Sequence, residues 1–570
     1  MPAGSTVEIP SDALFDLKAH RGEGMLLLAM NWRGGAPPDN FVGFAIEYCE
    51  PNGTQFYPLK NRLSFEGNAG SMSSEKRPPT FSTLVAPIQK FRWVHFPRNA
   101  ELQGDFIYRV TPVFMSGSDQ LSYGVARTTA VQLARETYPG VLNVAFTRGF
   151  ISSQAFVDNY VDHGPVNTLL PPDAKSGLSF VPTHPDTRRA LAWMGFEAYR
   201  ELLEVLDGAL ADATAEVGLV AYDLNLPDVV DRLARLGNRA RVIIDNSDEH
   251  HGEGAAEDQA ETALVAAGVQ VKRQKMGKLQ HNKTVYVDGA VMKAAIGGST
   301  NMSWRGLFVQ SNNLLLIRTE RAVAIFKQAF ETYWAAPSTF KKSASAEWMG
   351  LGLAEVDARI TFSPHSASNS VLKSVADDIR SATSSIFYSL AFLANTPGVI
   401  RDALGDQTGR NELFVTGISD QKAGVVVASS SSNSPPTYVA ALDANAPSPF
   451  REEPTGLAKG GLGTRMHHKF IVMDFDQPGA RVYLGSYNMS KTADSDNGEN
   501  LIVVRDKRVA TSYMIEAIRI IDHYQFRVLS KKDGKALKLK KPPRAPGETP
   551  WWDRDYKDPG KIKDRELFCP

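Results

Sequence analysis

The chain has 570 residues, of which 43% are hydrophobic and 22% are charged, and its 63 basic residues balance 63 acidic ones. This length predicts two to four domains rather than a single core. The even balance excludes an overall field that would draw the chain to nucleic acid or to anionic membranes, although local patches remain open.

Cysteine content and hydropathy indicate which kinds of protein this chain can be. Cys49 and Cys569 are separated by nearly the whole chain, so we expect two free thiols and neither a disulfide framework nor a cysteine metal motif. The start lacks a basic segment followed by an apolar one, and no apolar run reaches the roughly 18 residues of a membrane span. A cytoplasmic protein is therefore expected, with signal-independent export as the alternative.

Residues 1–137 are predicted to form a β-sandwich. Apolar residues alternate with other residues over 44–48, 91–93 and 106–110, and turn-forming clusters separate these stretches. That period of two is typical of antiparallel strands. The rhythm is similar to that of a fibronectin-type module. No polar cluster in it indicates chemistry, so packing, or binding of an unidentified protein, is its expected role.

Residues 138–336 are predicted to form an α/β half. Met194, Ala198, Leu202 and Val205 are spaced by three or four, which predicts an amphipathic helix over 190–210. Strands are expected at 217–222, 241–245, 285–287 and 294–296, with a helix over 227–236. Strands that alternate with helices indicate an α/β layer architecture.

The same order of elements restarts after a Ser/Ala/Lys-rich stretch, 337–350, which is predicted to be a linker. Helices around 372–382 and 514–521 and strands at 385–390 and 413–418 make residues 351–529 a second α/β half. The chain is thus expected to contain an internal duplication.

Residues 530–570 are predicted to form a basic extension that also contains Trp551 and Trp552. Two interpretations are open. The run Lys531–Lys541 could contact a membrane surface or another polyanion. The favoured interpretation is a solvated extension that packs its two Trp side chains on the domain.

One cassette occurs once in each half. It consists of H-x-K-x(4)-D followed by a Gly-Ser-x-Asn turn, and the His leads the turn's Asn by 20 residues in the first copy and by 21 in the second. Two copies in one chain indicate that both halves build a single site, for which a monomer suffices. The members are His281, Lys283, Asp288, Ser299 and Asn301 in the first half, and His467, Lys469, Asp474, Ser486 and Asn488 in the second.

Strand periodicity separates the roles of these residues. His and Lys stand two residues apart, so on a strand they share a face, whereas the Asp follows its His by seven and points the other way. Asp288 and Asp474 are therefore expected to be structural, bonding backbone or a neighbouring element. The residues expected to bind phosphate are Lys283, Lys469, Asn301, Asn488, Ser299 and Ser486.

The combined set suits a phosphodiester. One neutral imidazole, of His281 or His467, attacks phosphorus and forms a phosphohistidine, while the other, protonated, donates to the leaving alkoxide and then deprotonates water or an alcohol. Lys and Asn neutralise the charge on the non-bridging oxygens. No metal and no other cofactor is needed, because fixed cations do that work.

These residues resemble the phospholipase D superfamily, whose members carry two H-x-K-x(4)-D motifs. Two motifs with matching downstream turns are far more specific than one. The resemblance implies an α/β fold of two pseudo-symmetric α/β/α halves with the site at their junction. It also implies a phosphodiester hydrolase, first expected to hydrolyse or transfer phospholipid headgroups at lipid surfaces. A nuclease acting on DNA or RNA and a non-catalytic phosphodiester-binding scaffold are the alternatives.

The family usually places an acidic residue past the turn, to hold the His ring. Glu499 stands 11 residues after Asn488, but the same offset from Asn301 reaches Asn312. By this count Glu499 orients His467 and Asn312 orients His281. Because a carboxylate stabilises an imidazolium, the hypothesis is that His281 is the neutral nucleophile and His467 the resting proton donor. A decayed first half that binds without turnover is the alternative.

Two further stretches are candidates. Asp245–His251 contains carboxylates and imidazoles of the kind that ligate metals, but its Gly- and Glu-rich context favours a solvated lid near the site. The Gly-rich run Ala458–Thr464 leads into the second motif and is either a mobile wall of the site or a long connection.

Overall fold

The computed structural model describes residues 12–66, 79–149, 160, 163–393, 396–421, 424–429, 466–532 and 537–570. The chain divides into two units. The first holds residues 1–135, 429–434 and 524–570, and the second holds residues 136–428 and 435–523. The Gly-rich run 458–464 lies outside the described residues.

Two antiparallel sheets form the β-sandwich of the first unit. One has three strands in the order β1-β2-β7, and the other has the order β10-β8-β3-β4, with β9 on β8. Phe106, Tyr108 and Val110 of β8 are fully buried, as the alternation predicts. The sandwich is confirmed, while its likeness to fibronectin modules stays a prediction. The strands are β1 (Phe15–Arg21), β2 (Leu26–Trp32), β3 (Phe41–Cys49), β4 (Tyr57–Pro58), β5 (Lys60–Asn61), β6 (Phe81–Ser82), β7 (Arg92–His95), β8 (Asp105–Met115), β9 (Leu121–Tyr123) and β10 (Arg127–Gln132).

The end of the chain completes this unit, with helices α10 (Asp553–Lys557) and α11 (Pro559–Phe568). The Trp551 ring centroid lies 5.6 Å from that of Phe41, and Trp552 joins the sandwich core. Of the described lysines, Lys538 pairs with Glu66 and Lys541 with Asp119. The two Trp residues are packed as expected, and these two lysines are engaged with acids. The side chains of 531, 532 and 535 lie outside the described residues.

Two mixed sheets form the second unit, and their strand orders correspond apart from the additional edge strand β18 in the second sheet. The first runs β11-β17-β16-β15-β12-β13-β14, and the second runs β18-β19-β25-β24-β23-β20-β21-β22. The pair β12–β13 is parallel and β12–β15 antiparallel, as are their counterparts β20–β21 and β20–β23. The predicted duplication is therefore confirmed at the level of topology. The strands are β11 (Leu142–Phe146), β12 (Glu216–Ala221), β13 (Ala240–Asp245), β14 (Gln270–Gln274), β15 (Lys283–Asp288), β16 (Lys293–Gly298), β17 (Asn313–Ile317), β18 (Met349–Gly350), β19 (Asp357–Ser363), β20 (Ser385–Leu390), β21 (Phe414–Gln421), β22 (Gly424–Ser429), β23 (Lys469–Met473), β24 (Arg481–Gly485) and β25 (Glu499–Arg505).

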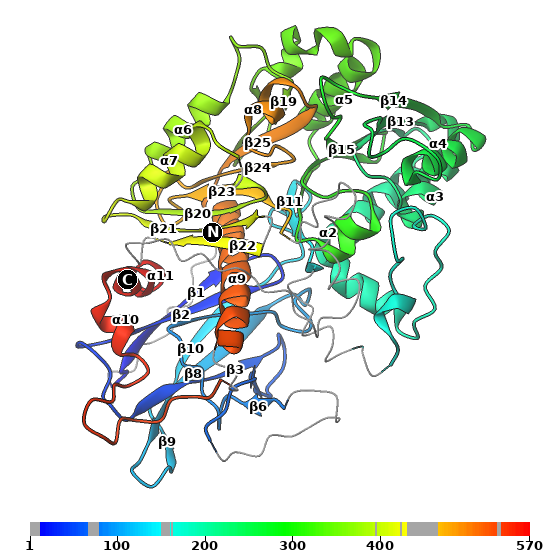
Figure 1. Cartoon of the computed structure of the whole chain (residues 1–570). Helices are drawn as coiled ribbons and strands as arrows, with labels where there is room; N and C mark the ends of the chain where they lie inside the picture. The colour runs from blue at the N-terminus through cyan, green and yellow to red at the C-terminus, as the bar shows by residue number, and fades with distance from the viewer. Residues whose placement is uncertain are drawn as a thin grey trace. The chain divides into compact units, whose positions relative to one another are not determined.

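Helices pack beside both sheets. In α3, Pro227 occupies the first turn, where its missing N–H costs nothing, and the apolar side of the helix is buried. Figure 1 shows α3 and α4 together near β13 and β14, and α6 and α7 paired beside the second sheet. The helices are α2 (Thr187–Ala211), α3 (Pro227–Leu236), α4 (Ala256–Ala266), α5 (Glu320–Ala335), α6 (Leu372–Arg380), α7 (Val399–Thr408), α8 (Lys491–Ser495) and α9 (Lys507–Lys532).

The stretch predicted to be a linker is packed rather than loose. It forms short 3-10 turns at Pro337–Lys342 and Ala344–Ala346. Phe340 is fully buried and stacks on Tyr333 of α5, with ring centroids 3.9 Å apart. A Ser/Ala/Lys-rich composition indicated only a turn region, and one aromatic side chain fixes it in place. Within the described residues, no helix has the length and apolar character needed to cross a membrane.

Candidate active site

Each cassette His lies just before a strand. β15 begins at Lys283 and β23 at Lys469, so the prediction that His281 and His467 lie on strands is wrong by two residues. Each Lys ammonium donates back to the carbonyl of its own His, at 2.6 Å in the first half and 2.7 Å in the second. All four side chains are buried, which removes the two imidazoles from bulk water and keeps a cation beside each.

Two short backbone bridges join the halves at this point. Gln280 pairs with Gly498, and Ser311 pairs with Met466. These residues directly precede His281, Glu499, Asn312 and His467. Each bridge therefore places the imidazole of one half next to a polar side chain of the other half.

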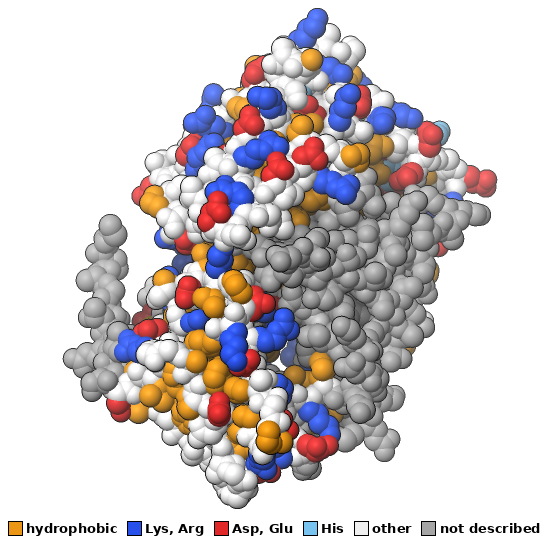
Figure 2. Space-filling model, turned by 60° about the vertical axis from the view of Figure 1, so that its left-hand side comes forward, with side chains coloured by type: hydrophobic (Ala, Val, Ile, Leu, Met, Phe, Trp, Pro, Cys, Tyr) orange, Lys and Arg blue, Asp and Glu red, His pale blue; other side chains and the backbone are white. Residues whose placement is uncertain are grey.

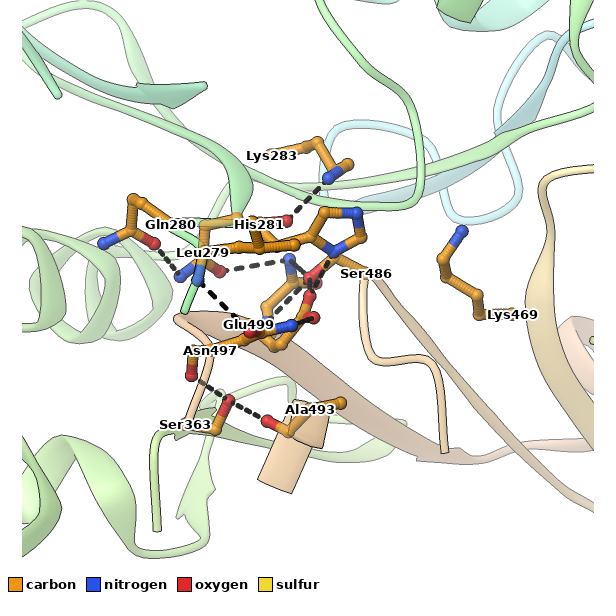
Figure 3. A network of polar contacts seen from close by, with 12 residues as sticks. Leu279, Gln280, His281, Lys283, Ser363, Lys469, Ser486, Ala493, Asn497 and Glu499 are labelled. Carbon is orange, nitrogen blue, oxygen red and sulfur yellow. Dashed lines mark hydrogen bonds and ion pairs between the residues drawn. The ribbon is translucent and has the colours of Figure 1, made fainter. Parts of the chain in front are cut away.

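The ring partners are consequently exchanged relative to the sequence-based expectation. His281 Nδ1 lies 2.7 Å from Glu499 Oε2, and His467 Nδ1 lies 2.8 Å from Asn312 Oδ1. Figure 3 draws the contact between His281 and Glu499. Counting residues within one half predicted the opposite pairing. It failed because the bridges carry each orienting residue across the junction. Glu499 and Asn312 do orient the rings, but each acts on the His of the other half.

These contacts define where the ring protons lie. The Asn312 amide nitrogen donates to the Gly306 carbonyl at 2.8 Å, so its oxygen faces the His467 ring. A carboxylate likewise only accepts, so both Nδ1 atoms carry hydrogen. Neither Nε2 atom has a hydrogen-bond partner within the part of the chain that the structure describes.

The turn hydroxyls were predicted to bind phosphate, and the structure assigns them another task. Ser486 Oγ donates to Glu499 Oε2 at 2.6 Å, and Ser299 Oγ donates to Asn312 Oδ1 at 2.9 Å. A hydroxyl has one hydrogen, so neither has a donor left for a phosphate oxygen. Ser299 and Ser486 instead fix Asn312 and Glu499, which bind the two imidazoles.

The first residue of each turn must be glycine. Gly298 has φ +145° and Gly485 has φ +144°, and an added Cβ would lie 2.4 Å from the Asn313 carbonyl oxygen and 2.1 Å from that of Asn500. Only glycine adopts this backbone at so close an approach. The approach puts each Ser beside its partner, since Glu499 begins β25 and Asn312 directly precedes β17.

Burial controls the charges of the site. It lowers the pKa of His467 well below the usual value, with Lys469, Lys283 and His281 adding to the effect. Burial also lowers the pKa of His281, against which Glu499 acts, and it lowers the pKa of Lys283 to about 8. Such mutual influence requires the two His and two Lys side chains to be close, and Figure 3 shows Lys469 reaching toward the His281 ring.

The two turn Asn side chains have hydrogen-bonding atoms without a partner among the described residues. Asn301 is 3% exposed, and its Nδ2 donates to Asp223 at 2.7 Å. The Oδ1 atoms of Asn301 and Asn488 are buried and have no hydrogen-bond partner among the described residues. Polar atoms left in this state indicate a place for a polar ligand.

The motif Asp residues lie away from the imidazoles. Asp474 accepts the backbone N–H groups of Thr383 and Ser384, at 2.9 and 2.7 Å. Asp288 pairs with Lys327 at 2.8 Å and Lys293 at 3.2 Å. These are structural contacts of the kind expected.

The stretch 245–251 is only partly a solvated loop. Asp245 and His250 are buried, and Asp223, His250 and Glu257 lie close enough to hold a metal. However, His250 Nε2 lies 3.0 Å from Asp223 and Nδ1 lies 2.9 Å from Asp245. Burial alone would lower the pKa of His250, but these carboxylates raise it to about 10. A doubly protonated ring has no lone pair for a metal, so the arrangement favours an ion cluster.

Sequence reasoning missed Tyr222 and Asp223. The Tyr222 ring contacts the His281 ring edge-on with centroids 4.6 Å apart, and Lys283 Nζ lies 4.6 Å from its centre. Both residues directly follow β12, at the strand end where site residues gather in α/β sheets. That position was the available signal.

Comparison with known proteins agrees with this arrangement. The family model described as cardiolipin synthase, PLD-like domain, matches residues 206–334 and 375–520, one segment in each half. A mitochondrial cardiolipin hydrolase of Chlamydomonas reinhardtii is 27% identical over 128 residues, which is 22% of this chain and 54% of the relative. The chain thus spans about half the length of that curated relative.

Solved structures are similar at low identity. A phosphatidylserine synthase of Haemophilus influenzae matches with a TM-score of 0.39 and 13% identity, over 66% of this chain and 93% of that one. Nuc, a phospholipase D family member of Salmonella typhimurium, matches with a TM-score of 0.20 and 20% identity, over 23% of this chain and 86% of that one.

Proposed function

This chain belongs to the phospholipase D superfamily, and from that premise we propose that it cleaves phosphodiesters through a covalent phosphohistidine. The observation that carries the proposal is the pair of buried imidazoles, each with its Nδ1 hydrogen held and its Nε2 atom left for chemistry. Lys283 and Lys469 supply the fixed positive charge that a phosphate anion requires.

The two imidazoles take different roles. The bound phosphate anion favours the imidazolium form of His467, because an opposite charge raises the pKa of a buried imidazole. His281 Nε2 then attacks phosphorus and the bond to the leaving alkoxide breaks, while His467 gives that alkoxide its Nε2 proton. His467 then removes a proton from water, whose oxygen displaces His281 from phosphorus. An alcohol in place of water gives transfer instead of hydrolysis.

Glu499 supports His281 as the nucleophile, for a reason different from the one predicted. Phosphorylation at Nε2 leaves the ring with a positive charge while Nδ1 keeps its hydrogen. A carboxylate 2.7 Å from Nδ1 stabilises that state. The amide oxygen on His467 stabilises an imidazolium less, so His467 releases its proton more readily.

A phospholipid is the proposed substrate. The matching family model is described as cardiolipin synthase and the curated relative as a cardiolipin hydrolase. Among the described side chains on the face shown in Figure 2, Lys and Arg are interspersed with Asp and Glu and form no continuous basic stripe of the kind that a long nucleic acid would favour.

One assay tests the proposal and its alternatives. The protein is incubated with EDTA and then offered vesicles of cardiolipin or phosphatidylcholine and, in parallel, single-stranded and duplex DNA. Release of a lipid headgroup or of phosphatidate supports the proposal, nicking indicates a nuclease, and silence in every arm indicates a non-catalytic scaffold. H281N and H467N must both abolish the activity. Activity that EDTA removes would contradict the metal-free mechanism.

A further inference from the structure

The first half carries a charged cluster at a place where the second half is apolar. Ala221 pairs with Lys283 across β12 and β15, as Leu390 pairs with Lys469 across β20 and β23. Two residues beyond these pairs lie Asp223 in the first half and Phe392 in the second. The two-imidazole reaction does not require this difference, so it calls for its own explanation.

Asp223 is fixed from both sides. Its Oδ1 lies 3.0 Å from His250 Nε2, and its Oδ2 accepts from Asn301 Nδ2 at 2.7 Å. His250 Nδ1 lies 2.9 Å from Asp245. Asp245 in turn accepts the backbone N–H of Gln280, the residue before His281, at 2.6 Å. The row Asp245–His250–Asp223–Asn301 therefore connects the residue before one cassette member, His281, to another cassette member, Asn301.

This arrangement determines which way the Asn301 amide faces. One of its two amide hydrogens is committed to Asp223, so the other hydrogen and the unpartnered Oδ1 remain for a ligand. It also leaves a carboxylate within electrostatic reach of Lys283, which offsets part of the positive charge in the site. The charged and titratable groups that face Asp223 are His250, Glu257, Tyr222, Lys283 and Arg305.

We propose that Asp223 determines charge specificity, because it positions Asn301 and disfavours a second negative charge on the bound phosphate. A phosphodiester carries one negative charge, whereas a phosphomonoester carries almost two at neutral pH and above. Asp223 would thus admit the diester and expel the monoester that hydrolysis leaves behind. The inference rests on the proposed function, since it assumes a phosphate group at the two imidazoles.

The test compares two small ligands that differ in this charge. Dimethyl phosphate is a monoanion throughout, whereas methyl phosphate passes from a monoanion to a dianion around pH 6. Calorimetric titration at pH 5 and pH 8 gives the ratio of their affinities. We expect the affinity of the wild-type protein for methyl phosphate, relative to that for dimethyl phosphate, to be about tenfold lower at pH 8 than at pH 5. D223N should lose most of this change, and D223E, which keeps the charge, should retain it.

Asp248→Asn is the matched control, since Asp248 lies in the nearby 245–251 stretch and its side chain is 97% exposed. It should behave as the wild type. An unchanged ratio in a folded D223N would overturn the proposal. If D223N does not fold, the wild-type protein alone still tests the proposal. A rise in its affinity for methyl phosphate relative to dimethyl phosphate between pH 5 and pH 8 would overturn the proposal. The readout is binding, so absence of turnover would defeat the proposed function and leave this inference standing.

Discussion

His281 Nδ1 lies 2.7 Å from Oε2 of Glu499, a residue 218 positions away in the other half of the duplicated unit. The reciprocal contact joins His467 to Asn312 at 2.8 Å. Neither half orients its own imidazole, so the site exists only where the halves meet. Ser486 and Ser299 bind the two orienting groups in the same way, which makes the junction nearly symmetric except for one carboxylate in place of one amide.

The first prediction concerns variants in which the carboxylate of Glu499 becomes an amide or the amide of Asn312 becomes a carboxylate. Glu499→Gln removes the group that opposes the lowered pKa of His281, so this pKa should fall further and the acidic limb of kcat/KM should move to lower pH. Its turnover should fall by about 10–100-fold. Asn312→Asp should raise the pKa of His467 and move the alkaline limb of kcat to higher pH. A shift of the alkaline limb in E499Q would instead indicate pairing within one half.

The second prediction concerns the covalent intermediate. With a 4-nitrophenyl phosphodiester the leaving group needs no proton, so H467N should release one equivalent of nitrophenol in a burst and accumulate phosphohistidine. H281N should show neither. His251→Asn is the control, since the His251 side chain is 69% exposed, and it should leave turnover unchanged. Peptide mapping identifies the modified residue, and label on His467 would refute the assignment.

The sequence was sufficient for the fold class and for the expectation that the two cassettes lie together. Strand and helix periodicities predicted elements of both halves, such as α3 and β20, because each has one buried side or a continuous buried run. The repeated cassette then predicted that His281 and His467 share a site. Both are local patterns, and a single chain displays them directly.

Pairing across the junction could not be predicted in this way. Glu499 orients His281 because Gln280 and Gly498 form a backbone bridge, and bridges between segments so far apart leave no local pattern. The roles of Ser299 and Ser486 were misjudged for a different reason. A Gly-Ser turn does not reveal which group its hydroxyl contacts, and each acceptor stands 13 residues further along the same half. Asp223 was missed because a single Asp after a strand is common, and its partners are 27 and 78 residues away.

The third prediction follows from Lys283, whose pKa burial lowers to about 8. Its ammonium is charged below that pH and neutral above it, so the free protein should lose affinity for a phosphate anion as pH rises through about 8. We expect kcat/KM to fall above this pH. Lys283→Arg, which stays charged, should remove this limb even if its overall rate is lower. A limb that persists in K283R would show that another group titrates there.

The fourth prediction separates the two motif Asp residues by stability. Asp474 is buried, accepts the backbone N–H groups of Thr383, Ser384 and Ser385 at the start of β20, and pairs with the buried Arg481 at 3.3 Å. Its φ of +54° is tolerated better by Asp than by Ala. Asp474→Ala leaves those donors without their acceptor and should lower the free energy of unfolding by about 3 kcal/mol. Asp288 makes half-exposed ion pairs with two lysines, so Asp288→Ala should cost less than about 1 kcal/mol. Urea unfolding followed by circular dichroism measures both. Equal losses would contradict the difference in burial between the contacts of Asp474 and those of Asp288.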